Sequence, residues 1–568
     1  MRRALVPLAL LLLGTASLGG QQVDTTALAR EIPRLLALAE VPAMSVAVIQ
    51  HGHVFWKGAF GTVGDSTGRP ADTLTVFEAA SLSKPVFAYI VMRLADRGEL
   101  DLDRPLAELL EYPRLAHDPR YKRITARMVL SHGTGLPNWG RDTLSLRFDP
   151  GTGYQYSGEG FVYLQRTIER TTGMTLEELA KREVFDPLGM TRSSYVWQDR
   201  FSGNAAYAKD WAWRMGPINR YSAANAAYSL LTTAGDYATF VVAVLNGTGL
   251  SPEMSRTYLS PLRSVRQPWR PELDDAHVRY GHGWGIQDGR AGQSIFHGGY
   301  NGRRFRAWVQ AYPSSRAGIV YFASGDEGDT FAEALLSRVV TDDPWALRWQ
   351  QTDRYDDPRR VALRGVQRAG VTSGADAALE RYRAMRANPA TRPTPSTAAN
   401  VIAFLKARDL GAAERPIAEM TVADHPDSGQ SHDLLALALL MAREYQAAIA
   451  AQGRSLAIQP ENEQGRRLIQ WINERMTSLK QPVTVPSATL ERYVGQYAER
   501  HVRLHDGRLF YKRGQDPEYP LTPITQDLFA VEGVESFRLR FVTDGPGPAT
   551  RTLGIEVNGN AFGLPRTK

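Results

Sequence analysis

The segment AASLSKPVFAYIVMRLADRGEL, residues 79–100, places a serine ahead of a helical pattern and a lysine three positions after that serine. From residue 85 onward apolar residues recur at helical spacing, and Gly98 ends the pattern. Residues three apart in a helix lie on the same face. The segment therefore predicts an amphipathic helix whose first turn brings Ser81 and Lys84 together.

This pairing is chemically coherent as a nucleophile with its base. A serine hydroxyl attacks poorly until a base takes its proton, and a lysine amine can be that base when burial or nearby cations lower its pKa. The free N–H groups of a helix start add partial positive charge near Ser81, and Pro85 is tolerated there because first-turn N–H groups have no intrahelical partner. The alternative interpretation is a capping serine beside a solvated Lys84.

Two other motifs compete for the nucleophile and the oxyanion loop. GDSTG, residues 64–68, matches Gly-x-Ser-x-Gly around Ser66, but that motif works between a strand and a helix, and residues 69–72 start no helical pattern. Because no helical pattern follows it, we interpret Ser66 as part of a turn. HGG, residues 297–299, is reminiscent of an α/β-hydrolase oxyanion loop, yet in that fold the loop precedes the nucleophile and here the order is reversed.

The amino terminus, MRRALVPLALLLLGTASLGGQQ, combines a basic start, a short apolar run and small residues. This pattern predicts a secretory signal peptide over residues 1–20 and a secreted or periplasmic protein. The apolar run is too short to span a bilayer, although an uncleaved anchor is the alternative. Beyond residue 20 no stretch is long and apolar enough for a transmembrane helix, so we expect none after cleavage.

Composition excludes several classes of function. The formal charge is +7, two units of which come from Arg2 and Arg3 in the leader, and no Lys/Arg block stands out. Nucleic-acid binding is therefore not expected. The chain has no cysteine, which excludes disulfides, thiolate metal sites and a cysteine nucleophile. No His/Asp/Glu set has metal-ligand spacing, so we expect neither a metal nor another cofactor.

The first part of the chain has strand patterns at both ends and helices between them. Residues 43–60 read as a hairpin that turns at 51–53. Strands return much later in the chain and are followed by a helix at about 329–340. This order predicts one α/β domain whose sheet is closed by distant parts of the chain. The later strands are expected at 293–297, 304–312 and 317–323.

Residues 375–480 are Ala-rich and helical in pattern. EYQAAIAAQGRSLAIQPEN, residues 444–462, resembles half of a tetratricopeptide repeat, and a helical linker subdomain is the alternative. If a protein partner exists, we expect it to bind through this region.

Residues 486–568 carry the signals of a small all-β module. HDGRLFYK (505–512) and IEVNGNAF (555–562) contain Asp-Gly and Asn-Gly turns, and SFRLRFV (536–542) alternates strictly. With LERYVGQY (490–497) at its start, the module resembles the lipocalin-like domain often appended to serine hydrolases of the family described next.

Seven segments in the same order resemble the serine β-lactamase and penicillin-binding protein superfamily, nearest to its class C β-lactamase and esterase branch. The resemblance implies an α/β domain over residues 24–355, built on an antiparallel sheet with a helical subdomain. The segments are FEAASLSKPVFAYIVMRLADRGELDLDRPL, ITARMVLSHGTGLPNW, YQYSGEGFVYLQ, FDPLGMTRSSY, AYSLLTTAGDYATF, YGHGWGI and FHGGYNGRRFRAWVQAYP.

The resemblance assigns roles to the first two motifs. Ser81 and Lys84 match the family's Ser-x-x-Lys. The family's Tyr-x-Asn reads Tyr156-Ser157-Gly158 here, so Tyr156 takes the base position and Gly158 replaces an asparagine that helps to hold the substrate amide and the lysine. This departure speaks against efficient β-lactam hydrolysis.

The third motif, Lys-Thr-Gly or His-x-Gly in the family, reads His297-Gly298-Gly299. A histidine here could share protons with the Tyr–Lys pair or bind a substrate carboxylate, and unlike lysine it is expected to titrate near neutrality. The resemblance implies that the backbone N–H groups of Ser81 and Tyr300 form the oxyanion hole.

Three further residues fall in the family-like segments. We expect His132 to have a role in a turn or in the core. We expect Glu159 to lie in a solvated loop, and the alternative is that its side chain faces the pocket. Trp139 either walls the cleft or packs against the protein.

Together these features predict a secreted serine hydrolase that forms an acyl-enzyme on Ser81 and cleaves a small ester or a D-amino-acid peptide or amide bond. The alternatives are a β-lactamase or D-Ala-D-Ala carboxypeptidase, and a non-catalytic ligand or cell-wall binding protein on a hydrolase fold.

Overall fold

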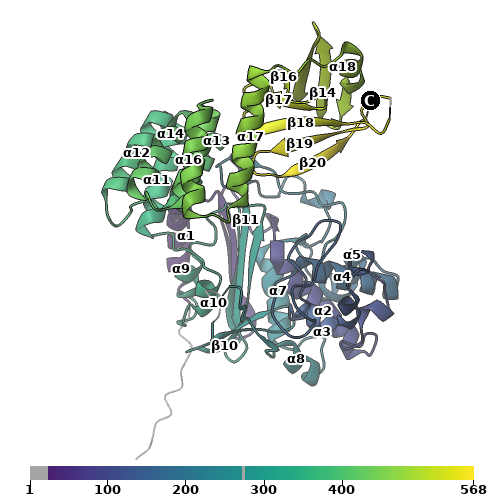
Figure 1. Ribbon diagram of the computed structural model, residues 1–568. Helices are drawn as coiled ribbons and strands as arrows, with labels where there is room; N and C mark the ends of the chain where they lie inside the picture. Colours follow the sequence, from purple (N-terminus) through teal and green to yellow (C-terminus); the bar gives the residue numbers. More distant parts are fainter. Residues whose placement is uncertain (1–22, 271–274, 546, 568) are drawn as a thin grey trace, which may run out of the picture. The chain divides into compact units, whose positions relative to one another are not determined.

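The computed structural model describes residues 23–270, 275–545 and 547–567, and the chain divides into two compact units, Met1–Tyr355 and Asp356–Lys568 (Figure 1). The signal peptide expected at residues 1–20 lies outside the described residues. No helix in the described part of the chain combines the length and apolar character needed to cross a membrane.

The first unit is built on an antiparallel sheet of eight strands, in the order β2-β1-β12-β11-β10-β9-β8-β7. Strand β1 of the early hairpin therefore pairs with the much later β12, with Met44 opposite Ala323, so distant parts of the chain close the sheet as the sequence predicted. The strands are β1 (Ala43–Gln50), β2 (His53–Gly61), β7 (Arg263–Ser264), β8 (Val278–Tyr280), β9 (Gly285–Gly289), β10 (Gly292–Asn301), β11 (Phe305–Tyr312) and β12 (Ala317–Ala323).

The turn between β1 and β2 has the expected chemistry. Gln50 pairs with His53, and the two residues between them, His51 and Gly52, have φ values of 51° and 75°. Positive φ at both central residues matches the right-handed twist of the flanking strands.

The central strands are buried on both faces, because helices cover the sheet on each side (Figure 1). Alternate residues of β1 enter different cores: Ala47 faces one and Val48 the other. The helices α2 (Ser83–Asp96), α4 (Gly158–Thr172) and α7 (Ala234–Leu245) belong to the first core. The helices α1 (Thr25–Ala39), α9 (Ala332–Leu336) and α10 (Trp345–Trp349) belong to the second.

The helix expected after Pro85 is α2, and Gly98 follows it with φ 74°. Its start differs in detail from the expectation. A single 3-10 turn, η1 (Ala80–Leu82), carries Ser81 and leads directly into α2. The helix expected at 329–340 is shorter in the structure, where α9 spans Ala332–Leu336.

The second unit opens with seven helices and ends in an all-β module. The first helix, α11, lies before residue 375, where the helical region was expected to begin. The last helix, α17, packs with the two helices before it and with Ile555 and Val557. The helices are α11 (Pro358–Ser373), α12 (Ala375–Ala387), α13 (Pro395–Ala407), α14 (Glu414–Asp424), α15 (Gly429–Met441), α16 (Tyr445–Ile458) and α17 (Glu463–Lys480).

The all-β module is a nearly closed antiparallel barrel of eight strands in sequence order, entered through α18 (Ser487–Tyr493). A bridge between Tyr497 and Arg566 brings its first and last strands together. The Asp506–Gly507 turn expected from the sequence joins β14 to β15. The strands are β13 (Gly495–Tyr497), β14 (Arg500–His505), β15 (Arg508–Arg513), β16 (Tyr519–Pro523), β17 (Leu528–Val531), β18 (Phe537–Val542), β19 (Arg551–Glu556) and β20 (Ala561–Pro565).

Candidate active site

Ser81 lies on a tightly held turn between β3 (Phe77–Glu78) and α2. Ala80 has a φ of 50°, a conformation that is costly for a residue with a side chain and that clusters at functional sites. The Ser83 hydroxyl fixes the turn, because it donates to Ala80 O at 2.6 Å and accepts from Leu230 N at 3.0 Å. Ser81 itself is half-buried.

Lys84 occupies the first turn of α2 and is 1% exposed. Its Nζ lies 3.1 Å from Ser81 Oγ and 2.8 Å from Ala227 O. The amine also sits 4.8 Å from the Tyr156 ring centroid and 5.7 Å from that of Phe161. Burial lowers the pKa of Lys84 to about 7, so much of the amine is neutral and able to accept a proton near neutral pH.

Tyr156 reaches the same cavity from the loop before α4. Burial raises the pKa of its phenol, and a hydrogen bond with Ser81 opposes that shift, so the phenol is protonated at neutral pH. His132 lies behind Tyr156 with 4.3 Å between ring centroids, and its Nδ1 accepts the Ser157 N–H at 3.1 Å. His132 is fully buried, in keeping with the core role expected for it.

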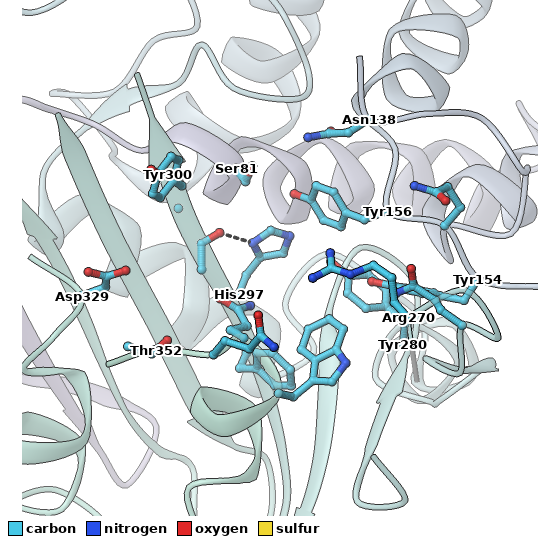
Figure 2. A pocket seen from close by; sticks show the side chains of 18 of the residues that line it. Ser81, Asn138, Tyr154, Tyr156, Arg270, Tyr280, His297, Tyr300, Asp329 and Thr352 are labelled. Carbon is cyan, nitrogen blue, oxygen red and sulfur yellow. Dashed lines mark hydrogen bonds between the residues drawn. The ribbon is translucent and has the colours of Figure 1, made fainter. Parts of the chain in front are cut away.

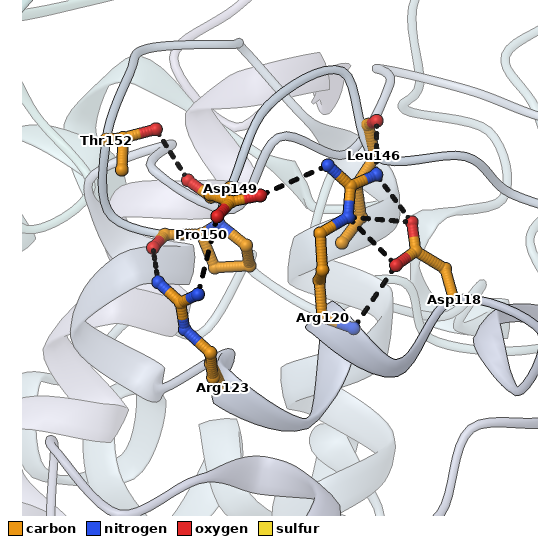
Figure 3. A network of polar contacts seen from close by, with 7 residues as sticks. All are labelled: Asp118, Arg120, Arg123, Leu146, Asp149, Pro150 and Thr152. Carbon is orange, nitrogen blue, oxygen red and sulfur yellow. Dashed lines mark hydrogen bonds and ion pairs between the residues drawn. The ribbon is translucent and has the colours of Figure 1, made fainter.

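The loop that leads to Tyr156 is pinned by two arginines (Figure 3). Arg120 pairs with Asp118 at 2.7 Å and with Asp149 at 3.2 Å, and it donates to Leu146 O at 3.1 Å. Arg123 donates to Pro150 O at 3.4 Å. These contacts stabilise residues 146–150, a few positions before Tyr156.

His297 lies in β10, opposite Tyr156 in the cavity (Figure 2). Its Nδ1 lies 2.8 Å from Gly298 O, which places the proton on Nδ1 and leaves Nε2 as an acceptor without a hydrogen-bond partner among the described residues. Burial and the charge of Lys84 lower the pKa of His297 to about 3. The expectation that this histidine titrates near neutrality is therefore wrong, because the ring has lost its solvation.

Gly299 is needed because β10 runs directly beneath the turn that carries Ser81. A Cβ at this position would lie 2.6 Å from Ala79 O and 2.9 Å from the Ala307 Cβ. Tyr300 follows on the same strand. β9 pairs with β10 only as far as Phe296, so the edge of β10 beside Ser81 has no strand partner in the described residues. Tyr300, whose N–H group the resemblance assigns to the oxyanion hole, lies on this part of β10.

Glu78, which the sequence analysis missed, connects the turn that carries Ser81 to the end of β10. Glu78 is fully buried three residues before Ser81. It accepts hydrogen bonds from Asn219 N at 2.9 Å and Tyr221 OH at 2.8 Å, and also from Asn301, the residue after Tyr300. Since the motifs contain no signal for this contact, only the fold reveals it.

Gly158 stands against the loop that precedes it in sequence. A Cβ at 158 would lie 2.5 Å from the Trp139 indole and 2.9 Å from Asn138 O. Glu159 pins that loop: it is buried, pairs with Arg114 at 2.6 Å and accepts the Gly140 N–H at 3.0 Å. Glu159 therefore lies neither in solvent nor in the pocket.

The cavity at this site has a volume of about 720 Å³ and is entirely within the first unit. Ser81, Asn138, Tyr156, His297 and Tyr300 line it together (Figure 2). Trp139 is not among its lining residues; it is half-exposed and packs edge-on against Tyr228. Arg147 and Arg270 also line the cavity. Much of the remaining wall is formed by the aromatic rings of Tyr154, Trp269, Tyr280, Phe296, Trp308 and Trp349.

Among the described residues, no three His, Asp or Glu side chains are grouped so that they could hold a metal ion. The structure brings together here the Ser81 hydroxyl, the Lys84 amine, the Tyr156 phenol and the His297 imidazole.

Comparison with models of protein families assigns this chain to a family. The model of the Beta-lactamase family matches residues 28–340, more than half of the chain. The chain belongs to the beta-lactamase family. It has the α/β fold of that family, followed by the helical region and the barrel-like module.

Beta-lactamase-family relatives of this chain have several activities. Unguisins hydrolase ungD of Aspergillus violaceofuscus (strain CBS 115571) is 24% identical over 385 residues, which cover 58% of this chain and 67% of the relative. Esterase EstB of Burkholderia gladioli is 33% identical over 185 residues; this match covers 27% of the chain and 47% of EstB, about half its length. Penicillin-binding proteins and a D-aminopeptidase are also relatives.

A solved class C beta-lactamase shares 19% of its residues with the chain and has a TM-score of 0.47; the match covers 53% of this chain and 91% of that structure.

Proposed function

We propose that this beta-lactamase-family chain is a serine hydrolase that forms an acyl-enzyme on Ser81. The observation that carries the proposal is the 3.1 Å contact between Ser81 Oγ and the buried Lys84 amine, whose pKa burial lowers to about 7. No carboxylate in the described residues forms an ion pair with Lys84 to hold it charged. A neutral amine at this distance can take the serine proton.

In the proposed mechanism Lys84 accepts the proton of Ser81 as its Oγ attacks the substrate carbonyl. The N–H groups of Ser81 and Tyr300 stabilise the oxyanion, a contribution of about 3–4 kcal/mol where one such donor has been removed from other enzymes. Tyr156, a neutral phenol, gives its proton to the leaving group as the bond to the carbonyl carbon breaks, and the protonated Lys84 returns a proton to the phenolate. Water then attacks the acyl carbon and loses a proton to Lys84, the bond to Ser81 Oγ breaks, and Lys84 returns that proton to the Ser81 oxygen.

We propose an ester or a D-amino-acid peptide or amide as the substrate class, rather than a β-lactam. Two features support this choice. Trp139 fills the space that a side chain at position 158 would need, so the family's asparagine has no room there. His297 is neutral at pH 7, so it does not supply the positive charge that lysine gives in Lys-Thr-Gly. Both features weaken binding of a lactam that carries a carboxylate.

The test is covalent labelling followed by kinetics. A fluorophosphonate should label Ser81 alone, and peptide mapping should find the adduct in residues 79–84; an adduct on Ser66 would overturn the assignment. Ser81→Ala should abolish labelling, with Ser66→Ala as the matched control that retains it. If intact wild-type protein is not labelled and hydrolyses no ester, amide or lactam, the non-catalytic binding alternative replaces this proposal.

Short p-nitrophenyl esters should be hydrolysed with a higher kcat/KM than nitrocefin. If nitrocefin exceeds every ester tried, the β-lactamase or carboxypeptidase alternative is correct.

The N-terminal pattern supports a proposed secreted or periplasmic location. The tetratricopeptide-like character of the helical region, its role in binding a protein partner and the lipocalin-like character of the barrel stay predictions.

A further inference from the structure

Glu78 carries a fully buried carboxylate whose hydrogen-bond partners are all neutral. Its Oε1 accepts the Asn219 N–H at 2.9 Å and an N–H of the Asn219 amide at 3.0 Å. Its Oε2 accepts the Tyr221 hydroxyl at 2.8 Å and an N–H of the Asn301 amide. Hydrogen bonds to a charged acceptor are about twice as strong as those between neutral groups, and burial strengthens them further. These contacts therefore hold the carboxylate and its donors firmly in place.

The contact between Glu78 and Asn301 joins the two segments that carry the proposed oxyanion hole. Ser81 lies three residues after Glu78, and Tyr300 directly precedes Asn301 at the end of β10. Ser81 and Tyr300 both line the cavity (Figure 2). Within the ranges that the structure describes, this contact is the one hydrogen bond between residues 78–83 and β10.

Tyr221 fixes the orientation of both partners in this contact. Its hydroxyl donates to Glu78 and accepts a second N–H from the Asn301 amide, at 2.7 Å. Since the Asn301 amide faces two acceptors, the atom that it presents to them is Nδ2. Glu78 cannot turn away from Asn301 without losing its hydrogen bonds to Asn219 and Tyr221.

The strength of an oxyanion hole depends on where its donors lie before the substrate arrives. Each donor must lie about 2.7–3.1 Å from the oxygen on which the charge develops, and a misplacement of about 1 Å can cost about 100-fold in rate. In this chain the two N–H groups belong to Ser81 and Tyr300, which come from remote segments. Their spacing is therefore a property of whatever connects those segments.

We infer that Glu78 and Asn301 are positioning residues whose contact sets the spacing between the N–H groups of Ser81 and Tyr300, and with it the strength of the oxyanion hole. The inference rests on the proposed function. A second negative charge does not stabilise a developing oxyanion, so the contribution of Glu78 is geometric, through the donor that it holds.

Asn301→Leu tests the inference in the full-length protein, because it removes the contact with β10 and leaves Glu78 its bonds to Asn219 and Tyr221. The probes are p-nitrophenyl acetate and p-nitrophenyl thionoacetate, in which sulfur replaces the carbonyl oxygen. Sulfur is a weak hydrogen-bond acceptor, so the thionoester gains less from the oxyanion hole. The ratio of the two kcat/KM values, ester to thionoester, should fall about 10-fold or more. Intrinsic reactivity cancels when the variant is compared with wild type.

Tyr221→Phe is the matched control. It removes one hydrogen bond from the same Glu78 oxygen and one from the same Asn301 amide, but it keeps the contact between these two residues. We expect the ratio to stay within about threefold of the wild-type value, and thermal unfolding to show a loss of stability comparable to that of Asn301→Leu.

An exchange of donor and acceptor supplies a second test. Asn301→Asp sets two carboxylates against each other and should lower the ratio at least as far as Asn301→Leu. Adding Glu78→Gln provides an amide N–H from the opposite side, so the double variant should recover the ratio to within about threefold of wild type. A double variant no better than Asn301→Asp would overturn the inference.

The outcomes also separate this inference from the function on which it rests. Labelling of Ser81 with an unchanged ratio in Asn301→Leu would overturn the inference alone. An equal loss for ester and thionoester would do the same, because it would show a structural role only, and so would a fall of the same size in Tyr221→Phe. Absence of both labelling and turnover in the wild type would overturn the proposed function and the inference together.

Discussion

A buried cation in the second unit, Arg475, and one in the first unit, Lys84, have opposite electrostatic surroundings. In the second unit Arg475 on α17 is 3% exposed and pairs with Glu532 at 2.9 Å; Glu535 lies 3.8 Å away. Burial lowers the pKa of Arg475, but the hydrogen bond and charges of these glutamates outweigh it. In the first unit Lys84 is as deeply buried and has only a hydroxyl, a carbonyl and aromatic rings around it.

The difference shows what separates a structural cation from a proposed base. A carboxylate partner keeps a buried cation charged and makes it part of the fold's stability. Without such a partner, burial works against the charge, and a lysine becomes a neutral amine near pH 7. Because the pKa of Lys84 is lower in the folded protein than in the unfolded chain, burial of its charge destabilises the fold fully below pH 7. This destabilisation is relieved as pH rises from 7 to the ordinary pKa of lysine.

The sharpest test exchanges each cation for methionine. Lys84→Met should lower kcat for p-nitrophenyl esters by more than about 100-fold, because the base is gone, while the first unit melts at a higher temperature. Arg475→Met should leave the buried Glu535 with Arg443 as its remaining cationic partner, and it should destabilise the second unit by up to about 3 kcal/mol, with ester hydrolysis retained. Calorimetry and steady-state kinetics measure both variants; a lower melting temperature for Lys84→Met would contradict the comparison.

Tyr156→Phe removes the phenol while keeping the ring that shields Lys84. We expect kcat to fall by more than about 100-fold with an unchanged circular dichroism spectrum, since proton transfer to the leaving group is lost. Steady-state kinetics on the same esters gives the measurement. Wild-type activity in this variant would remove Tyr156 from the mechanism.

The titration of Lys84 should appear in the pH dependence of ester hydrolysis. The neutral amine is the active form, so kcat/KM should fall as pH drops through about 7, by about tenfold per unit well below that value. The apparent pKa belongs to the coupled Lys84 and Tyr156 pair. A profile that is flat between pH 5 and 8 would show that Lys84 is not the base.

The smallest effect is expected from a methyl group beneath the Ser81 turn. Gly299→Ala places its Cβ against the backbone of Ala79, which must shift, so kcat should fall about tenfold or more. Gly298→Ala is the matched control, because its Cβ meets only the end of the flexible Gln350 side chain, and we expect at most about a threefold change. Equal effects of the two substitutions would show that the glycines act only on folding.

Local sequence rules determined the elements that carry the site. The 3.6-residue period after Pro85 gave α2, the spacing of Ser81 and Lys84 placed them together, and turn residues located the β1–β2 hairpin and the Asp506–Gly507 turn. These outcomes depend on backbone geometry over a few residues, which neighbours in the chain dictate. Closure of the sheet by distant strands followed from the order of the strand and helix patterns, and its antiparallel character followed from the resemblance to a family.

Only the tertiary structure decided how the candidate site groups behave. The pKa of Lys84 is lowered to about 7 because Tyr156, Phe161 and Ala227 come from other parts of the chain to surround it. His297 lost its expected titration by the same burial. Glu159 found Arg114 rather than solvent, and Asn138 came to lie beside Gly158. Desolvation and steric exclusion depend on which remote segments pack around a group, and spacing along the chain does not encode that packing.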